Sequence, residues 1–360
     1  MRKRNSGRVG AWVLALSFVM SVFLMSVHHA VAQPQMQEVP FAQLPSWSAM
    51  QAQEGFKAWL HSCGHYNTHG AGIFGKKVPL QRWQRACDRA KRTPISEAQR
   101  FFEEEFTAYA LRLPHSAEGF MTGYYTPHVD ASASRSAAYP YPIYRKPKTD
   151  ALRTAYSRAQ INAGALAGKG LELLWVANEV DAFFLHIQGS GYARFADGTL
   201  RKLVFAGKNQ HPYVAIGRQF VQEGVVDAKH MSMQWLKAWL HAHPQQARSV
   251  MERNPSYIFF DEASASEGIR GAAGTQLSPY HSVAVDPAYM DYGIPLYIDA
   301  KAMPKRGTHQ AMAITQDTGS AIKGALRLDY YLGTSDEAEQ IAGELKSPVR
   351  LFALLPRGMR

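Results

Sequence analysis

The sequence predicts a mainly β protein with helical decoration, and three observations lead to that fold class. Short apolar runs broken by Gly and Pro fill the middle and the last third of the chain. These runs do not alternate regularly with helical segments, which argues against a doubly wound parallel sheet and for β-barrels. A length of 360 residues with 46% apolar residues is enough for two packed domains and excludes a disordered chain.

The first 32 residues read as a secretory signal. Four basic residues, at positions 2, 3, 4 and 8, precede an uncharged apolar run from Ala11 to about Val27, and Ala30-Val31-Ala32 supplies a small-x-small site. We expect cleavage after Ala32, which would leave 328 residues and lower the net charge from +11 to +7. The alternative is an uncleaved anchor, because the run is just short of a comfortable membrane span. No cysteine follows the site, so we expect no lipobox and no lipid anchor.

Residues 33–115 form a predicted N-terminal helical region. The stretch from Gln33 to about Leu44 is polar and is expected either to wrap the surface or to be loose. Apolar residues at helical spacing then predict a helix over Trp47–His61. A second helix is predicted from Thr93-Pro94 to about Leu111, with Phe101, Phe102, Phe106 and Tyr109 as its buried stripe.

Two cysteines, Cys63 and Cys87, are the only ones in the chain. Both follow the export signal, so an oxidising compartment favours a disulfide between them. Two buried free thiols are the alternative. A zinc site is not expected, because neither cysteine has a second cysteine at ligand spacing.

Strand-like and helical runs follow Pro114 in a fixed order. The predicted strands are Phe120–Tyr125, Tyr141–Arg145, Leu171–Ala177, Ala182–Gln188, Leu200–Ala206, Tyr257–Phe260, Ser282–Val285, Leu296–Asp299, Ala311–Thr315, Leu328–Leu332 and Val349–Leu354. The predicted helices between them are Tyr213–Glu223, Ser232–Ala242 and Gln245–Arg253.

Candidate acids gather in the last 80 residues. Asp317 and Asp329 are separated by a Gly-rich turn that carries Lys323, and strand-like residues flank both ends. A carboxylic acid that donates a proton near neutral pH needs partial burial, and small neighbours let a substrate approach it. Asp286 ends a nearby strand in the same way. Taken alone, an Asp in a turn is more often structural, because it caps its own backbone.

Six motifs follow one another in a fixed order: Thr122–Pro127 (TGYYTP), Tyr141–Arg145 (YPIYR), Phe184–Gly191 (FLHIQGSG), Asn254–Phe260 (NPSYIFF), Val283–Pro287 (VAVDP) and the segment 316–333. With these motifs the chain resembles the membrane-bound lytic murein transglycosylase A (MltA) family with its three-aspartate (3D) domain. The resemblance runs from about residue 116 to 356 and extends more weakly through the N-terminal helices.

The resemblance implies a fold and a division of the chain. It implies a double-psi β-barrel, a second β-barrel inserted into it, and a groove between them. The signal would occupy residues 1–32, the N-terminal region 33–115, the MltA-type domain with the inserted barrel 116–280, and the 3D domain 281–360.

The resemblance also implies an activity. It is non-hydrolytic cleavage of the β-1,4 bond between N-acetylmuramic acid and N-acetylglucosamine in peptidoglycan, which leaves 1,6-anhydromuramic ends. By motif position the catalytic acid falls on Asp329, with Asp317 as its neighbour and Asp286 in support. A single acid such as Asp329 is enough for this reaction. In an intramolecular attack one group acts first as acid and then as base, whereas a hydrolase normally needs two carboxylates.

Further motif residues are candidate substrate contacts. They are Thr122, Tyr124, Gln188, Ser190, Gly191 and Lys323. Gln188, Ser190 and Gly191 are expected to end a strand whose polar tip meets sugar acetamides, with a plain turn as the alternative. Lys323 could meet a muramyl or stem-peptide carboxylate, whereas an exposed loop lysine is usually only solvated.

The expected partners follow from the same resemblance. Peptidoglycan glycan strands are the substrate, cell-wall synthesis or division proteins are candidate partners, and we expect a monomer with no cofactor and no metal. The protein is expected to be exported and periplasmic, with outer-membrane association as a further expectation. Nucleic acid is not expected, because the basic residues are dispersed and no base-stacking motif is present. The competing functions are a non-catalytic peptidoglycan-binding protein and a glycoside hydrolase on the same fold.

Overall fold

Six strands close into a barrel in the computed structural model, which describes residues 33–67 and 70–358. The predicted signal lies outside these residues. Around the barrel the strands follow the order β5 (Gly119–Tyr124), β15 (Arg327–Tyr331), β12 (Ser282–Ala284), β14 (Gly307–Asp317), β13 (Pro295–Met303) and β16 (Lys346–Pro356), and β16 pairs with β5 to close the ring. The β5–β15 and β12–β14 pairs are parallel and the other pairs are antiparallel.

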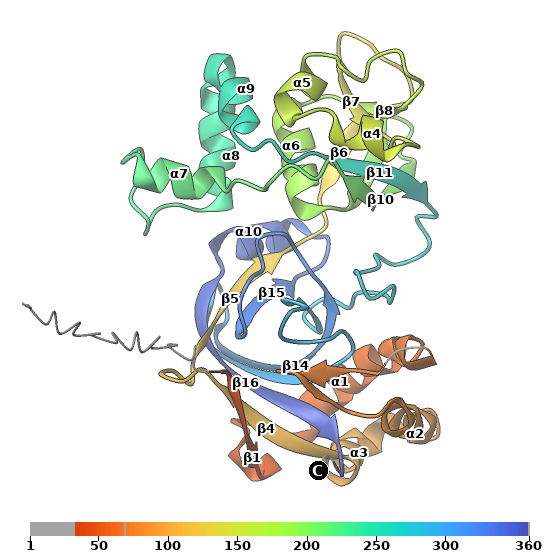
Figure 1. Ribbon diagram of the computed structural model, residues 1–360, viewed down its shortest axis with the longest axis vertical. Coiled ribbons are helices and arrows are strands. Elements are labelled where there is room, and N and C mark those ends of the chain that lie inside the picture. Colours follow the sequence, from red (N-terminus) through yellow and green to blue (C-terminus); the bar gives the residue numbers. More distant parts are fainter. Residues whose placement is uncertain (1–32, 68–69, 359–360) are drawn as a thin grey trace, which may run out of the picture. The chain divides into compact units, whose positions relative to one another are not determined.

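Two N-terminal strands extend the barrel sheet at β16. β4 (Phe106–Arg112) pairs with β16, and β1 (Gln35–Val39) pairs with β4, so β4 lies between the first and the last strand of the described chain (Figure 1). Both strands correct expectations. The stretch 33–44 is not loose, because its first half is a ladder strand. The helix predicted to reach Leu111 ends at Glu105, because alternate residues from Phe106 onward face the core and their backbone joins the sheet.

Three helices cover this barrel on its N-terminal side: α1 (Ala49–Ser62), α2 (Leu80–Ala90) and α3 (Ala98–Glu105). Their aromatic side chains, among them Trp59, Phe101 and Phe102, are almost fully buried in one core with the barrel strands. Cys63, just after α1, and Cys87, in α2, form a disulfide with their Cα atoms 5.6 Å apart. A two-strand hairpin, β2 (Gly72–Ile73) and β3 (Lys76–Lys77), connects α1 to α2, and α10 (Asp336–Glu344) precedes β16.

The inserted segment between β5 and β12 forms a second sheet. Its order is β11 (Ile258–Ala263), β10 (Leu200–Lys208), β9 (Gly191–Phe195), β6 (His128–Ser132), β8 (Glu172–Val176) and β7 (Tyr141–Tyr144). The edge strands β7 and β11 approach each other without a hydrogen-bonded ladder, so the second barrel is a half-barrel. Six helices accompany it in the described chain: α4 (Asp150–Thr154), α5 (Arg158–Asn162), α6 (Glu179–Gln188), α7 (Ile216–Gln222), α8 (Met233–Ala242) and α9 (Pro244–Glu252).

The strand predicted over Ala182–Gln188 is wrong, because this segment belongs to α6. The Asn178 side chain caps the helix by accepting hydrogen bonds from the N–H groups of Val180 (2.8 Å) and Asp181 (3.3 Å), and Gly189 ends it with φ +78°. Six of its ten residues are buried, including Ala182 through His186 in succession. A helix buried on all sides has no polar face, so its sequence shows no 3.6-residue period.

No helix in the described ranges is both long enough and apolar enough to cross a membrane.

Candidate active site

The barrel register sets four residues in one row across adjacent strands. Thr122 on β5 is opposite Asp329 on β15, Asp329 is opposite Ala284 on β12, and Ala284 is opposite Asp317 on β14. Directly opposed residues project from the same face of a sheet. The two aspartates are therefore two strands apart on one face, about 9 to 10 Å between Cα atoms at the usual strand spacing, with only a methyl group between them.

Asp329 is partly exposed, and its carboxyl is held by a short chain of donors. The Thr122 hydroxyl donates to Oδ1 of Asp329, and Nη2 of Arg327 donates to the Thr122 oxygen at 2.7 Å. Burial of the carboxyl raises the pKa of Asp329 to about 6, and the charge of Asp317 adds to this. The Thr122 hydrogen bond and the Arg327 charge oppose the rise. The result is a carboxyl that carries a proton at mildly acidic pH and loses it near neutrality.

Asp317 is anchored more firmly than Asp329. Its Oδ1 accepts hydrogen bonds from the backbone N–H groups of Ala272 and Thr318, both at 2.9 Å, and its Oδ2 accepts one from the Tyr124 hydroxyl at 3.0 Å. Burial raises the pKa of Asp317, while these three hydrogen bonds work against the rise. Three donors suit a carboxylate that keeps its place and its charge while a neighbour exchanges protons.

Asp286 stands outside the row and holds the turn between Asp317 and Asp329. Its side chain accepts hydrogen bonds from the N–H groups of Gly324 (2.9 Å) and Ala288 (3.2 Å), and the Lys323 ammonium lies 3.6 Å away. Burial acts to raise the pKa of Asp286, but these contacts outweigh it and the pKa is lowered. The lowered pKa favours the anionic form of Asp286, and its hydrogen bonds hold the loop; a supporting role in catalysis stays a prediction.

The predicted substrate residues divide into two groups. Thr122 and Tyr124 touch the two aspartates directly, as described above. Gln188 is the last residue of α6, and its side chain accepts a hydrogen bond from the backbone N–H of Tyr125 at 3.2 Å. This bond joins the end of α6 to the residue that follows β5. Lys323 is brought to Asp286 and not to the aspartate row.

Ser190 lies in the turn after α6, and Gly191 is the first residue of β9. A side chain at Gly191 would stand 2.4 Å from Cδ1 of Leu185 and 3.0 Å from the Pro127 carbonyl, so close packing accounts for this glycine. Substrate contact by Gln188, Ser190, Gly191 and Lys323 stays a prediction.

Three groups near the aspartates were missed in the sequence. Arg327 lies two residues before Asp329 on a strand, and period-two spacing could have found it. The N–H of Ala272 comes from an irregular loop and has no sequence signal. Tyr213, in the insert, lies near enough that the charge of Asp329, after burial, helps to raise the pKa of its phenol.

Two family models match most of the inserted segment and the C-terminal block. The MltA specific insert domain matches residues 120–261, and the 3D domain matches residues 281–355.

Known proteins are also similar to this chain in sequence and in structure. A membrane-bound lytic murein transglycosylase A of Vibrio cholerae is 36% identical over 240 residues, which cover 65% of this chain and 64% of that protein. The crystal structure of MltA from Neisseria gonorrhoeae has a TM-score of 0.78 and 32% identity, with 91% of this chain and 94% of that chain covered. MltA of Escherichia coli, solved with bound chitohexaose, has a TM-score of 0.72 and 27% identity, with 91% and 94% covered. In sequence, the chain spans 64% of the length of the curated relatives it matches first.

Proposed function

Because the chain belongs to the MltA family, we propose that it is a lytic transglycosylase that cleaves peptidoglycan glycan strands without consuming water. The observation that carries the proposal is Asp329, a carboxyl with a pKa of about 6 in a row with Thr122 and Asp317. The relative solved with chitohexaose supports a glycan ligand. The bond cut would be the β-1,4 link from N-acetylmuramic acid to N-acetylglucosamine.

In the proposed reaction one carboxyl first donates a proton and then accepts a different one. Protonated Asp329 gives its proton to the glycosidic oxygen, and the C1–O bond breaks with its electron pair going to the leaving sugar. The resulting carboxylate takes the proton of the muramic acid C6 hydroxyl as that oxygen bonds to C1. The products are a free 4-hydroxyl and a 1,6-anhydro ring, and Asp329 ends protonated as it began.

The neighbours of Asp329 have separate parts in this scheme. The Thr122 hydroxyl stabilises the carboxylate formed in the first half of the reaction, and Arg327 orients that hydroxyl. The Asp317 charge favours the protonated form of Asp329 at the start. The same anion is placed to favour positive charge that develops at C1 of the sugar.

Asp329→Asn tests the proposal directly. Asn keeps the shape and the acceptor for Thr122 but can neither donate nor take the proton, so we expect turnover of murein sacculi to fall by about a hundred- to ten-thousand-fold. Asp88→Asn, an exposed change on α2, is the matched control. A variant that solubilises sacculi at the wild-type rate would show that Asp329 is not the catalytic acid.

Mass spectrometry of the released muropeptides separates a transglycosylase from a hydrolase. Anhydro ends are one water lighter than reducing ends, and we expect anhydro ends. A product set made only of reducing ends would favour the hydrolase, with Asp317 as its second carboxylate.

The cellular setting is part of the same proposal. Export to the periplasm and association with the outer membrane would bring the enzyme to its polymer, and the curated relatives carry the description membrane-bound. A monomer, and contacts with cell-wall synthesis or division proteins, are proposed on the family resemblance alone.

A further inference from the structure

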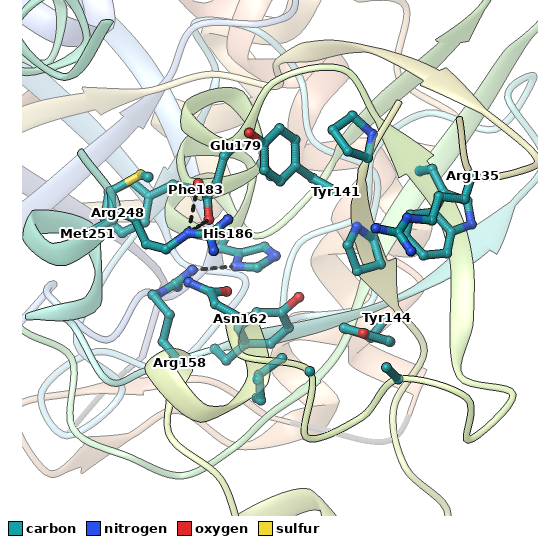
Figure 2. Close-up of a pocket in the computed structure, with 18 residues that line it drawn as sticks. Arg135, Tyr141, Tyr144, Arg158, Asn162, Glu179, Phe183, His186, Arg248 and Met251 are labelled. Carbon is teal, nitrogen blue, oxygen red and sulfur yellow. Dashed lines mark hydrogen bonds and ion pairs between the residues drawn. The ribbon is translucent and has the colours of Figure 1, made fainter. Parts of the chain in front are cut away.

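A cavity of about 310 Å³ lies within the insert, away from the aspartate row. Its walls come from the β7 and β8 strands, helices α5, α6 and α9, and the loops beside them, and none of Thr122, Asp317 or Asp329 lines it (Figure 2). The volume is at the lower end of the range for small-molecule sites. Aromatic rings of Tyr141, Trp175 and other residues supply much of the wall.

Arg158 is a buried cation in this cavity wall, only 3% exposed. It donates to two backbone carbonyls, from Nε to Asn254 at 3.0 Å and from Nη2 to Ser256 at 2.6 Å, and from Nη1 to Nδ1 of His186 at 3.0 Å. No carboxylate lies within ion-pair distance of it in the described part of the chain. Burial lowers the pKa of Arg158 to about 10, which still leaves it charged at neutral pH. The structure thus maintains an unneutralised positive charge beside a cavity.

His186 adds a free donor to the same wall. A guanidinium can only donate, so Nδ1 of His186 must be the acceptor and the ring proton must be on Nε2. His186 is 6% exposed, and Nε2 has no hydrogen-bond partner among the described residues. Figure 2 shows this nitrogen on the side of the ring away from Arg158, toward the space bounded by Tyr141 and Arg135. Burial, and then the Arg158 charge, keep the pKa of His186 well below its usual range, so the ring stays neutral.

The net charge of the cavity wall is positive. Three arginines line it, Arg135, Arg158 and Arg248, against one carboxylate, Glu179. Glu179 is bound to Arg248 at 2.9 Å, so it is not available to the other two. Arg135 packs over the Trp175 ring at 5.6 Å and has no ion pair with any described carboxylate. Two guanidinium groups and one N–H donor therefore line a cavity whose one carboxylate is already paired with Arg248.

We propose that this cavity is a second binding site, for a small carboxylate with a flat or apolar body. Buried polar groups are normally satisfied, and an orphaned donor beside an unpaired cation is most simply satisfied by an anionic acceptor. The carboxylate would accept from Nε2–H of His186 beside the positive charge of Arg158, with Arg135 and Trp175 closing over its body. Two sources present such a group, the terminal carboxylate of a peptide and the lactyl carboxylate of muramic acid. The site does not depend on the proposed catalytic role of Asp329.

Calorimetric titration of the whole protein tests the site with two matched probe pairs. One pair is N-acetylmuramic acid and N-acetylglucosamine, which lacks the lactyl carboxylate, and the other is N-acetyl-D-alanyl-D-alanine and its C-terminal amide. We expect one carboxylate probe to bind at least about tenfold more tightly than its neutral counterpart and to weaken as salt rises. Which pair responds identifies the source.

Variants place the binding in the cavity. Arg135→Ala changes an exposed side chain and is expected to fold and to weaken the responding probe by roughly fivefold or more. Arg194→Ala, an exposed arginine of the same sheet that pairs with Asp130 at 2.9 Å, is the matched control and should not change the affinity.

Nitrogen NMR of the histidine side chains gives a readout that needs no variant. The Nε2–H signal of His186 should shift when the carboxylate probe is added and stay fixed with the neutral probe. The proposal is wrong if neither carboxylate probe binds at millimolar concentration, or if binding is indifferent to Arg135→Ala and leaves the His186 signal in place.

Discussion

Opposing effects set the pKa of Asp329. Burial and the Asp317 charge raise it, whereas the Thr122 hydrogen bond and the Arg327 charge lower it. With a pKa of about 6, roughly one molecule in ten carries the proton at pH 7. Burial and the Asp317 charge set this fraction, and the Thr122 hydroxyl keeps the carboxylate form accessible. An acid held near its working pH is what a residue needs when it must both give and take a proton.

The raised pKa of Asp329 makes a prediction about stability as a function of pH. The folded protein binds this proton more tightly than the unfolded chain, so Asp329 makes the free energy of unfolding fall as pH rises from about 4 to about 6. Asp329→Asn removes the penalty, and we expect it to be more stable than wild type by about 1 to 3 kcal/mol at pH 7 and equal to it near pH 3.5. Urea denaturation at the two pH values measures this. An equal or lower stability of the variant at pH 7 would contradict the raised pKa.

Thr122 makes a prediction about the pH dependence of activity. The hydrogen bond of its hydroxyl lowers the pKa of Asp329, so Thr122→Val should raise that pKa and move the fall of kcat/KM to higher pH. The maximum rate should drop by about tenfold, because the carboxylate intermediate loses a donor. Thr122→Ser keeps the hydroxyl and should retain the wild-type profile. A Val variant whose profile does not move would assign Thr122 to packing alone.

Among the elements, α6 shows where sequence reasoning succeeds and where it stops. The runs that became β5, β7, β8, β10 and the barrel strands were visible because they are short, apolar and bounded by Gly or Pro. Ala182–Gln188 has the same appearance but belongs to a helix, because Asn178 caps α6 and five successive residues, Ala182 to His186, are buried without a polar face between them. β4 was hidden for the opposite reason, since its aromatic residues continue the helical spacing of α3 until pairing with β16 takes over.

The site residues also divide into those that the sequence could reveal and those that it could not. Asp329, Asp317, Thr122 and Tyr124 could be selected because the motifs of the resemblance contain them. The register that sets Ala284 between the aspartates depends on strand pairings between residues far apart in sequence, and no local pattern reveals it. The Ala272 N–H is a backbone group in a loop, so its identity carries no information about its role.

The cap of α6 makes a prediction at the scale of the element. Asn178→Ala leaves the N–H groups of Val180 and Asp181 without their side-chain acceptor and should cost about 1 kcal/mol of stability. Because α6 carries Phe183 and His186 of the cavity wall, loosening its first turn should also weaken binding in the insert cavity. Asn178→Asp retains an acceptor and serves as the control in thermal denaturation. Equal melting of the Ala and Asp variants would show that the cap contributes nothing.

At the scale of the molecule, the Cys63–Cys87 disulfide ties α1 to α2 across 24 positions. Closing a loop of this length in the unfolded chain is worth about 3 kcal/mol. We expect the Cys63→Ser/Cys87→Ser variant to lose roughly that amount in urea denaturation under oxidising conditions. Added reductant should lower the stability of wild type to that of the double variant and leave the double variant unchanged. A wild type insensitive to reduction would show that helix packing alone holds this region.

The pairing of β5 with β15 and β16 also determines when the site can exist during synthesis. Thr122 and Asp329 are 207 positions apart, and the strand that closes the barrel, β16, is the last one described. A chain made from its N-terminus can complete the inserted sheet while β15 and β16 are still missing, because all six of its strands lie between β5 and β12. The Thr122–Asp329 hydrogen bond can form only after β15 has been made. A chain interrupted before β15 can therefore have a folded insert, but it lacks the acid.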